Sequence, residues 1–214
     1  MRDIETTRLV LHAIDESEAG HICARAPGPN DKWVADYPFV GDLAAVGSLL
    51  RATELHGEQR PFGYYQIVRV ADGLAVGGAG FKGPPRGGSV EAGYGLAPSA
   101  RGHGYAAEAL TALLILAANY GVATVLADST ADNVPSQRTL GSAGFTLVGA
   151  DADLQHYEIR LGEPRRHLPA RQPGIVSRDG PGNSQRRPSA DRNCPAGGSL
   201  TRTDGLEGAV LGGG

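Results

Sequence analysis

Apolar residues recur along the chain with two periods, and these periods predict a mixed α+β domain. Alternation at every second position is typical of strands, whereas spacing of three and four is typical of helices. The predicted strands cover residues 7–12, 63–70, 74–81, 89–96, 124–128, 145–148 and 154–161. The predicted helices cover residues 15–26, 42–55, 105–120 and 133–144, with Asp15 and Asp42 capping the first two. We therefore expect about four helices and a sheet of six to seven strands.

The connections between the predicted strands indicate how they pair. Residues 63–70, 74–81 and 89–96 follow one another with connections too short for a parallel crossover, so these strands are expected to be antiparallel. The helix at 105–120 is apolar nearly all round, so we expect it to be buried against the sheet. The strand at 124–128 then returns parallel to 89–96 through a right-handed crossover. The sheet is predicted to be mixed and mostly antiparallel.

The connection between residues 89–96 and the helix at 105–120 has the chemistry of an anion site. The strand pattern breaks at Pro98, and Gly102 and Gly104 stand where the helix begins. Glycine tolerates positive φ and lets backbone N–H groups approach a ligand, and the first turn of a helix offers unpaired N–H donors. The sequence therefore predicts that this turn binds a pyrophosphate.

A dinucleotide-binding turn is the main competing interpretation. Gly102, Gly104 and Ala107 fit the pattern G-x-G-x-x-A, and Asp128 ends the next strand. However, residues 97–101 separate the preceding strand from Gly102, whereas the dinucleotide turn follows its strand directly, and three hairpin-linked strands come before it. A P-loop is excluded because the chain has no G-x-x-x-x-G-K-[ST].

Composition divides the chain near residue 161. Residues 162–214 contain no Phe, Tyr or Trp and are rich in Gly, Pro, Ser and Arg, so we predict a disordered tail after a domain at residues 1–161. From residue 163 onward eight Arg face five Asp and Glu, which leaves a charge of −6 on the body. The arginines are scattered and have no aromatic residues between them, so a solvated tail is favoured over a nucleic-acid-binding arm.

The charge, the cysteines and the hydropathy of the chain indicate its cellular location and the classes of partner it can have. The net charge of −3 points to neither nucleic acid nor an acidic substrate. Cys23 and Cys194 are too few for a disulfide framework and lack the spacing of a metal site, which favours a reducing compartment. No apolar run reaches membrane-spanning length, and the N-terminus has no signal-peptide pattern. We expect a cytoplasmic protein without nucleic-acid or membrane partners, either a monomer or a homodimer.

The glycine turn and its surroundings resemble a known family. Residues 101–106 (RGHGYA) are similar to the R/Q-x-x-G-x-G/A signature of the GNAT superfamily of N-acetyltransferases. Residues 91–98 (EAGYGLAP) resemble the splayed strand that precedes this signature in the family, and residues 133–136 (NVPS) with 144–145 (GF) resemble its second cofactor segment. The resemblance implies the GNAT fold, whose mixed sheet is splayed at the cofactor site.

The opening of the chain narrows the resemblance to one branch. Residues 7–11 (TRLVL) are similar to the first strand of the branch that includes the ribosomal-protein alanine acetyltransferases. The resemblance covers residues 6–161, and the order of elements derived above is the order of that fold.

The resemblance implies that acetyl-CoA is the cosubstrate and that no metal takes part. Backbone N–H groups of the turn would hold the pyrophosphate, and the break at Pro98 would leave backbone groups of the splayed strand free to pair with the pantetheine amides. Asn133 would bond the pantetheine arm from the far side. The implied cofactor-binding residues are Leu96, Ala97, Arg101, Gly102, His103, Gly104, Tyr105, Ala106 and Asn133.

Acetyl transfer to an amine requires a base, and several residues could serve. Glu91, at the start of the splayed strand, is the first candidate, acting directly or through a water, although an exposed strand carboxylate would look the same in the sequence. Glu158 is the second candidate, and His156 or His12 could substitute.

The departing thiolate requires a proton, and the family resemblance indicates which residues could donate it. Many members use a Tyr four residues before the Gly-Phe pair, but that position holds Leu140 here. The branch resemblance implies Ser136 instead, and the alternative is that Ser136 is only a first-turn helix hydroxyl.

The resemblance thus implies transfer of acetyl from acetyl-CoA to a primary amine by direct attack in a ternary complex. The acceptor would be a protein N-terminus or a small amine. The alternative is a non-catalytic acyl-CoA-binding or sensing module on the same fold. Trp33, Tyr37 and Phe39 either seal the edge of the core or wall an acceptor pocket.

Overall fold

The computed structural model describes residues 3–162, and these form one sheet of eight strands. Their spatial order is β1-β2-β3-β4-β5-β6-β8-β7. The strands are β1 (Ile4–Glu5), β2 (Leu9–Ala13), β3 (Tyr64–Arg69), β4 (Ala75–Phe81), β5 (Ser89–Leu96), β6 (Thr124–Thr130), β7 (Thr146–Ala150) and β8 (Leu154–Arg160). All neighbours pair antiparallel except β5 and β6, as predicted. The strand number was underestimated because β1, with two residues, is too short to show an alternation.

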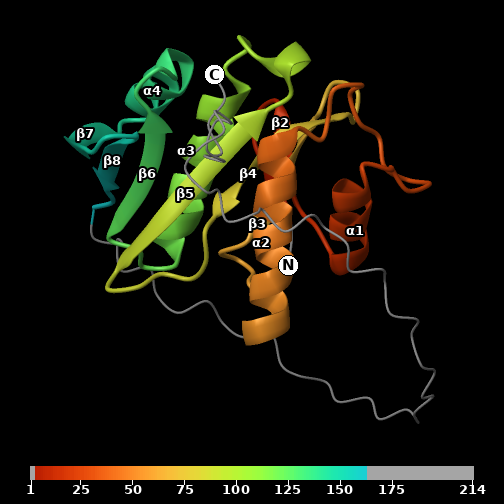
Figure 1. Cartoon of the computed structure of the whole chain (residues 1–214), viewed down its shortest axis with the longest axis horizontal. Helices are drawn as coiled ribbons and strands as arrows, with labels where there is room; N and C mark the ends of the chain where they lie inside the picture. The colour runs from red at the N-terminus through yellow and green to blue at the C-terminus, as the bar shows by residue number, and fades with distance from the viewer. Residues whose placement is uncertain (1–2, 163–214) are drawn as a thin grey trace.

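Four α-helices cover the two faces of this sheet, which gives the three-layer arrangement in Figure 1. They are α1 (Glu16–Ala24), α2 (Val40–His56), α3 (Tyr105–Asn119) and α4 (Val134–Ser142). Helix α2 lies in front of β3 in the view of Figure 1 and packs with α1. Helix α3 lies behind the sheet, against β5, β4 and β2, and contacts α4. The buried apolar residues accordingly form two clusters, one for each face.

The helix starts match the sequence analysis at α1 but not at α2. Asp15 caps α1 in a capping box with Glu18, whose side chain accepts from the Asp15 backbone N–H. Helix α2 begins at Val40, two residues before the predicted cap. Asp42 is therefore an N3 residue, and its Oδ2 accepts the backbone N–H of Phe39 at 3.1 Å. The prediction of Asp42 as the N-cap was wrong. A carboxylate can take part in a capping box at the N-cap or at N3, and the sequence alone does not distinguish the two positions.

The aromatic segment before α2 packs on the sheet. Tyr37 is buried, and its hydroxyl lies 3.2 Å from that of Tyr64. Trp33 meets the Tyr37 ring edge-on at 5.3 Å. The ring of Phe39 covers Gly95 of β5 so closely that a Cβ on Gly95 would come within 2.2 Å of it. Tyr37 thus belongs to the core, while Phe39 lies against the strand that precedes the glycine turn.

One further observation bears on location. Within residues 3–162 no helix is long and apolar enough to span a bilayer. The cytoplasmic location stays a prediction, and the tail predicted at residues 162–214 lies almost wholly outside the described residues.

Candidate active site

The glycine turn has the geometry that its sequence predicts. A single 3-10 turn (Pro98–Ala100) follows β5, and Gly102 and Gly104 then adopt φ of 78° and 76°, in the left-handed region that favours glycine. Gly104 is the N-cap residue of α3 and has no side chain to cap it. The first-turn N–H groups of α3 therefore have no partner within the helix and face a site of positive potential.

A cavity of about 220 Å³ opens beside this turn. The turn, the end of β5 and the first turn of α3 form one wall, and α4 forms the other. Residues Leu96, Gly102, Gly104, Ala106, Ala107, Pro135, Arg138 and Thr139 line it. Four of these were predicted as cofactor-binding residues, namely Leu96, Gly102, Gly104 and Ala106.

Helix α4 contributes the wall that the sequence analysis largely missed. Pro135, Arg138 and Thr139 have the spacing i, i+3, i+4 and therefore share one face of the helix. This spacing could have identified them once Asn133 was taken as the helix start. Arg138 brings a permanent positive charge to the cavity opposite the N-terminus of α3. The cavity is thus suited to an anionic group.

The predicted splay of the sheet is present at β5 and β6. The two strands pair only from Ser89 to Glu91 on β5 and from Thr124 to Leu126 on β6. Successive N–H groups of a strand point to opposite sides. Because the N–H of Ala97 donates to the Val76 carbonyl on β4 at 2.9 Å, the N–H of Leu96 points toward β6. The Leu96 carbonyl accepts from Nε of Arg101 at 3.2 Å. A strand edge without a partner in the sheet therefore extends from the cavity back toward Glu91. The Leu96 N–H lies on this edge, whereas the Ala97 N–H is bonded to β4.

The side chains of His103 and Tyr105 contact neighbouring groups of the protein. Nδ1 of His103 lies 3.4 Å from the carbonyl of Ala100, and its ring stacks on that of Tyr105 with 5.5 Å between centroids. The guanidinium of Arg8 lies 5.0 Å from the centre of the Tyr105 ring. His103 and Tyr105 thus meet neighbouring side chains, and what the turn offers a ligand is its backbone.

Asn133 and Ser136 both serve the start of α4. Oδ1 of Asn133 accepts the backbone N–H of Ser136 at 3.1 Å, which makes Asn133 the N-cap. Ser136 is fully buried, and its Oγ lies 2.9 Å from the hydroxyl of Tyr94, which also donates to the Ser136 carbonyl at 3.1 Å. Burial raises the pKa of the Tyr94 hydroxyl to about 12. This pair ties β5 to α4, and the Ser136 hydroxyl is turned to Tyr94.

Glu91 lies where the pairing of β5 with β6 ends, with 33% of its side chain exposed. It forms an ion pair with Lys82. Burial raises the pKa of the Glu91 carboxyl above its usual value, Lys82 opposes this, and the carboxylate of Asp128 adds to the rise. Nδ1 of His156 lies 2.7 Å from Oδ1 of Asp128, so three adjacent strands contribute to one polar row. Glu91 is therefore a half-buried carboxyl group beside the splay.

The other base candidates lie in different surroundings. His12 on β2 contacts Asp3 and Glu18, near the start of α1, and not the splayed edge. Glu158 on β8 shares the face of Glu91 but lies 3.5 Å from Arg160. His156 also bonds Asp151, and hydrogen bonds to Asp128 and Asp151 raise its pKa. Within residues 3–162 no group of three or more His, Cys, Asp or Glu is placed to hold a metal ion.

Solved structures share this fold at low sequence identity. An acetyltransferase from Agrobacterium tumefaciens str. C58 is 22% identical, with a TM-score of 0.54 and coverage of 74% of this chain and 94% of that one. RimL, a ribosomal L7/L12 alpha-N-protein acetyltransferase in complex with coenzyme A, is 20% identical, with a TM-score of 0.55 and coverage of 75% and 98%. The ribosomal-protein-S5-alanine acetyltransferase of Vibrio fischeri is 16% identical, with a TM-score of 0.54 and coverage of 79% and 100%.

Sequence comparison gives the family. The uncharacterized N-acetyltransferase YjdG of Bacillus subtilis (strain 168) is 29% identical over 164 residues, which are 72% of this chain and 95% of that protein. Residues 8–146 match the acetyltransferase (GNAT) domain. This match spans β2 to β6, the glycine turn and α4, so the chain belongs to the GNAT family of N-acetyltransferases.

Proposed function

We propose that this chain transfers the acetyl group of acetyl-CoA to a primary amine by direct attack in a ternary complex. The observation that carries the proposal is the cavity between the glycine turn and α4. Its walls combine the unpaired N–H groups at the start of α3 with the guanidinium of Arg138, which is the chemistry that recognises a pyrophosphate.

The splayed edge of β5 supports a direction for the rest of the cosubstrate. The turn follows the end of β5, so a pantetheine arm that starts at the turn runs back along the strand, past the Leu96 N–H and toward Glu91. Leu96 and Glu91 are five residues apart, about 17 Å along a strand. This separation suits a long arm whose reactive end lies near Glu91.

Glu91 then serves as the base. It takes a proton from the amine, directly or through a water, and the nitrogen attacks the thioester carbon to form a C–N bond and an oxyanion. The C–S bond breaks next, and the thiolate leaves with its electron pair. The raised pKa of Glu91 suits this role because a stronger base takes the amine proton more readily.

The departing thiolate also needs a proton. Leu140 and Ser136 are both fully buried, and the Ser136 hydroxyl is turned to Tyr94. Ser136 can act on the sulfur only if that contact rearranges. This observation favours the second candidate function, a module that binds acyl-CoA without turnover. Release of free thiol separates the two functions.

A protein N-terminus or a small amine is the proposed acceptor. RimL and the Vibrio fischeri enzyme are described as acetyltransferases of ribosomal proteins, and both share this fold. Phe39, packed against Gly95, lies on the same sheet face as Glu91 and would border the acceptor.

The first test is acetyl-CoA binding followed by thiol release. Acetyl-CoA is expected to raise the thermal midpoint, since a ligand at 100 times its Kd adds about 2.7 kcal/mol to the folded state, whereas NAD should have no effect. Gly104→Asp should abolish the shift because it adds a negative charge to the turn, where the new Cβ would lie 3.5 Å from Nη2 of Arg8. Gly104→Ala is the control, because it shares the strain of positive φ without the charge. Native affinity in Gly104→Asp would mean that the phosphates bind elsewhere.

Glu91→Gln tests the base. We expect kcat to fall about a hundredfold or more with acetyl-CoA affinity unchanged. The wild-type enzyme should lose activity as the pH falls through a pKa above the usual value for Glu, and the variant should lack this acidic limb. Glu158→Gln is the matched comparison on the same sheet face. An unchanged rate in Glu91→Gln with a slow Glu158→Gln would transfer the role to Glu158.

A further inference from the structure

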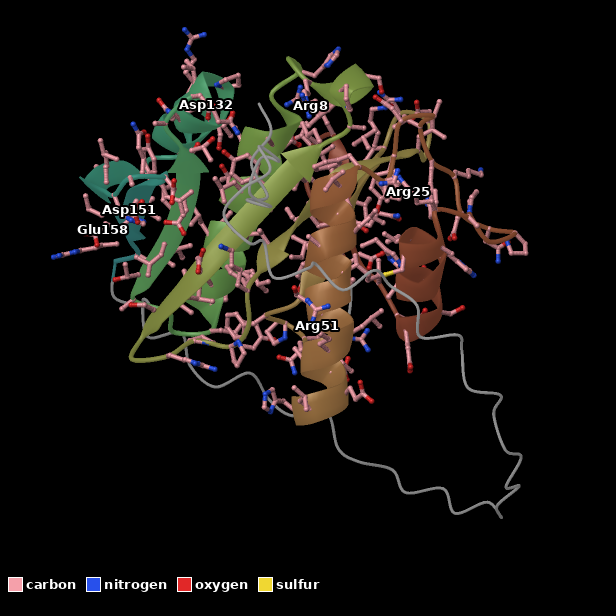
Figure 2. All side chains as sticks on the ribbon, in the orientation of Figure 1. Arg8, Arg25, Arg51, Asp132, Asp151 and Glu158 are labelled. Carbon is pink, nitrogen blue, oxygen red and sulfur yellow. The ribbon has the colours of Figure 1, made fainter. Side chains whose placement is uncertain are left out.

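A cluster of charged groups lies directly against the glycine turn, and neither the cavity nor the catalytic proposal uses it. It consists of Thr6 and Arg8, which lie just before β2, Glu108 on α3 and the backbone of His103. Figure 2 labels Arg8 beside the connection that follows β5. Nε of Arg8 donates to Oε2 of Glu108 at 2.7 Å, and its Nη1 donates to the His103 carbonyl at 2.8 Å. Two sequence-distant segments therefore meet at the turn.

The contact with His103 fixes the orientation of one peptide. In a planar trans peptide the C=O and the following N–H point to opposite sides. Because Arg8 holds the His103 carbonyl, the N–H of Gly104 points away from Arg8. Gly104 lines the cavity, so this N–H is a donor for an anion there.

That orientation needs a restraint because the turn is rich in glycine. Gly104 has φ of 76°, and a glycine permits rotation of the preceding peptide at little cost. A rotated peptide would present the His103 carbonyl oxygen in place of the Gly104 N–H. Carbonyl oxygen repels a phosphate, so the direction of this one peptide decides whether the turn binds an anion.

Arg8 is itself held firmly enough to impose this restraint. The carboxylate of Glu108 also accepts the Arg8 backbone N–H at 2.9 Å and the Thr6 hydroxyl at 2.6 Å. The Arg8 guanidinium lies over the Tyr105 ring at 5.0 Å, and 48% of its side chain is exposed against 17% for Glu108. The guanidinium is therefore held by three groups, namely the Glu108 carboxylate, the His103 carbonyl and the Tyr105 ring.

Charge gives a second effect in the same direction. Glu108 lies in the first turn of α3, close to the proposed phosphate position. Burial opposes its ionisation, but hydrogen bonds from Thr6 and Arg8 lower the pKa of Glu108, so it carries a negative charge at neutral pH. Without Arg8 this carboxylate would repel an approaching pyrophosphate.

From this geometry we infer that Arg8 is a positioning residue for the pyrophosphate of acetyl-CoA. It orients the Gly104 N–H toward the cavity and neutralises Glu108, without touching the ligand. The inference rests on the proposed function, which assigns the pyrophosphate to this turn.

Arg8→Gln tests the inference by calorimetric titration with CoA and with dephospho-CoA, which keeps the pyrophosphate and lacks the 3′-phosphate. We expect Kd to rise about tenfold to a hundredfold for both ligands, as for loss of a charge-assisted hydrogen bond. The kcat/KM for S-acetylpantetheine, which has no phosphate, should match the wild type. A parallel loss with S-acetylpantetheine would mean that Arg8 only supports the fold, and unchanged CoA affinity would overturn the inference outright.

Two further variants separate the effect of charge from the effect of peptide orientation. Arg8→Gln/Glu108→Gln removes the repulsion but not the loss of peptide orientation, so it should recover part of the lost affinity. Arg60→Gln, which removes the arginine of an ion pair with Glu58, is the matched control and should bind CoA as the wild type does. If wild-type protein binds no CoA, the proposed function fails. If wild type binds while Gly104→Asp does not, and Arg8→Gln binds normally, only the role of Arg8 fails.

Discussion

Asp42 is a fully buried carboxyl whose partners are all neutral. Its Oδ1 accepts the Tyr64 hydroxyl at 2.8 Å, and Oδ2 accepts the Phe39 N–H. Burial raises the pKa of Asp42 to about 7, although both hydrogen bonds favour the ionised form. The folded state therefore binds a proton that the unfolded chain releases at much lower pH.

This residue is expected to make the protein less stable as the pH rises from about 4 to 7. In that range the folded state binds more protons than the unfolded state, so the contribution of Asp42 falls by up to about 1.4 kcal/mol per pH unit and is then constant. Asp42→Asn removes this dependence, at a cost of about 1–3 kcal/mol at low pH, because the amide leaves the Phe39 N–H unpaired.

Urea unfolding of both proteins across this range checks the prediction. The stability gap between wild type and Asp42→Asn should narrow as the pH rises. Asp132→Asn, at an exposed position labelled in Figure 2, is the control and should leave the pH profile unchanged. A gap that stays constant would show that Asp42 is ionised throughout.

At the scale of elements, β4 depends on the absence of side chains. All seven of its residues are buried, and three are glycines. A Cβ on Gly77 would lie 2.2 Å from the Gly95 carbonyl oxygen and 2.9 Å from the Leu96 Cα. Both atoms belong to the backbone of β5 and cannot move aside without shifting the strand. The strand that carries the splayed edge is thus positioned by a glycine on its neighbour.

Gly77→Ala should therefore destabilise the protein by about 1–3 kcal/mol and weaken CoA binding, since the added Cβ pushes on Leu96. Gly149→Ala is the matched control on β7, where the nearest atom to a new Cβ is 4.0 Å away. Thermal unfolding and CoA titration of the two variants give the comparison. Equal behaviour would mean that β4 and β5 can separate freely.

The elements themselves were largely predictable because their signals are local. The strand-like runs of β3 to β6, the cap at Asp15 and the glycines of the turn are each defined within a few residues. The predicted start of α2 was wrong because the sequence does not show whether the carboxylate of Asp42 stands at the N-cap or at N3 of the helix. Contacts such as that between Tyr94 and Ser136, 42 residues apart, leave no local signal, so the burial of the Ser136 hydroxyl could not be foreseen.

At the scale of the whole molecule, the family resemblance identified the glycine turn in the sequence, whereas the residues that pack around this turn are seen only in the structure. Gly102, Gly104 and Ala106 line the cavity, but Arg138 lines it from α4, and Arg8, just before β2, bonds the His103 carbonyl of the turn. Their arrival depends on how the sheet is assembled, not on any spacing near the turn. The motif alone therefore gives only part of the proposed anion site.

The strand order β6-β8-β7 also has a consequence for synthesis on the ribosome. The chain emerges from its N-terminus, so β7 is made before β8, yet β8 pairs with both β6 and β7. Until residue 160 has emerged, β6 has an open edge and β7 has no partner in the sheet. The nascent chain can assemble β1 to β5 early, but it must carry an incomplete second half until its last strand inserts. A ribosome stalled before Leu154 would hold a protein with an exposed sheet edge, the kind of surface that chaperones and other nascent chains recognise.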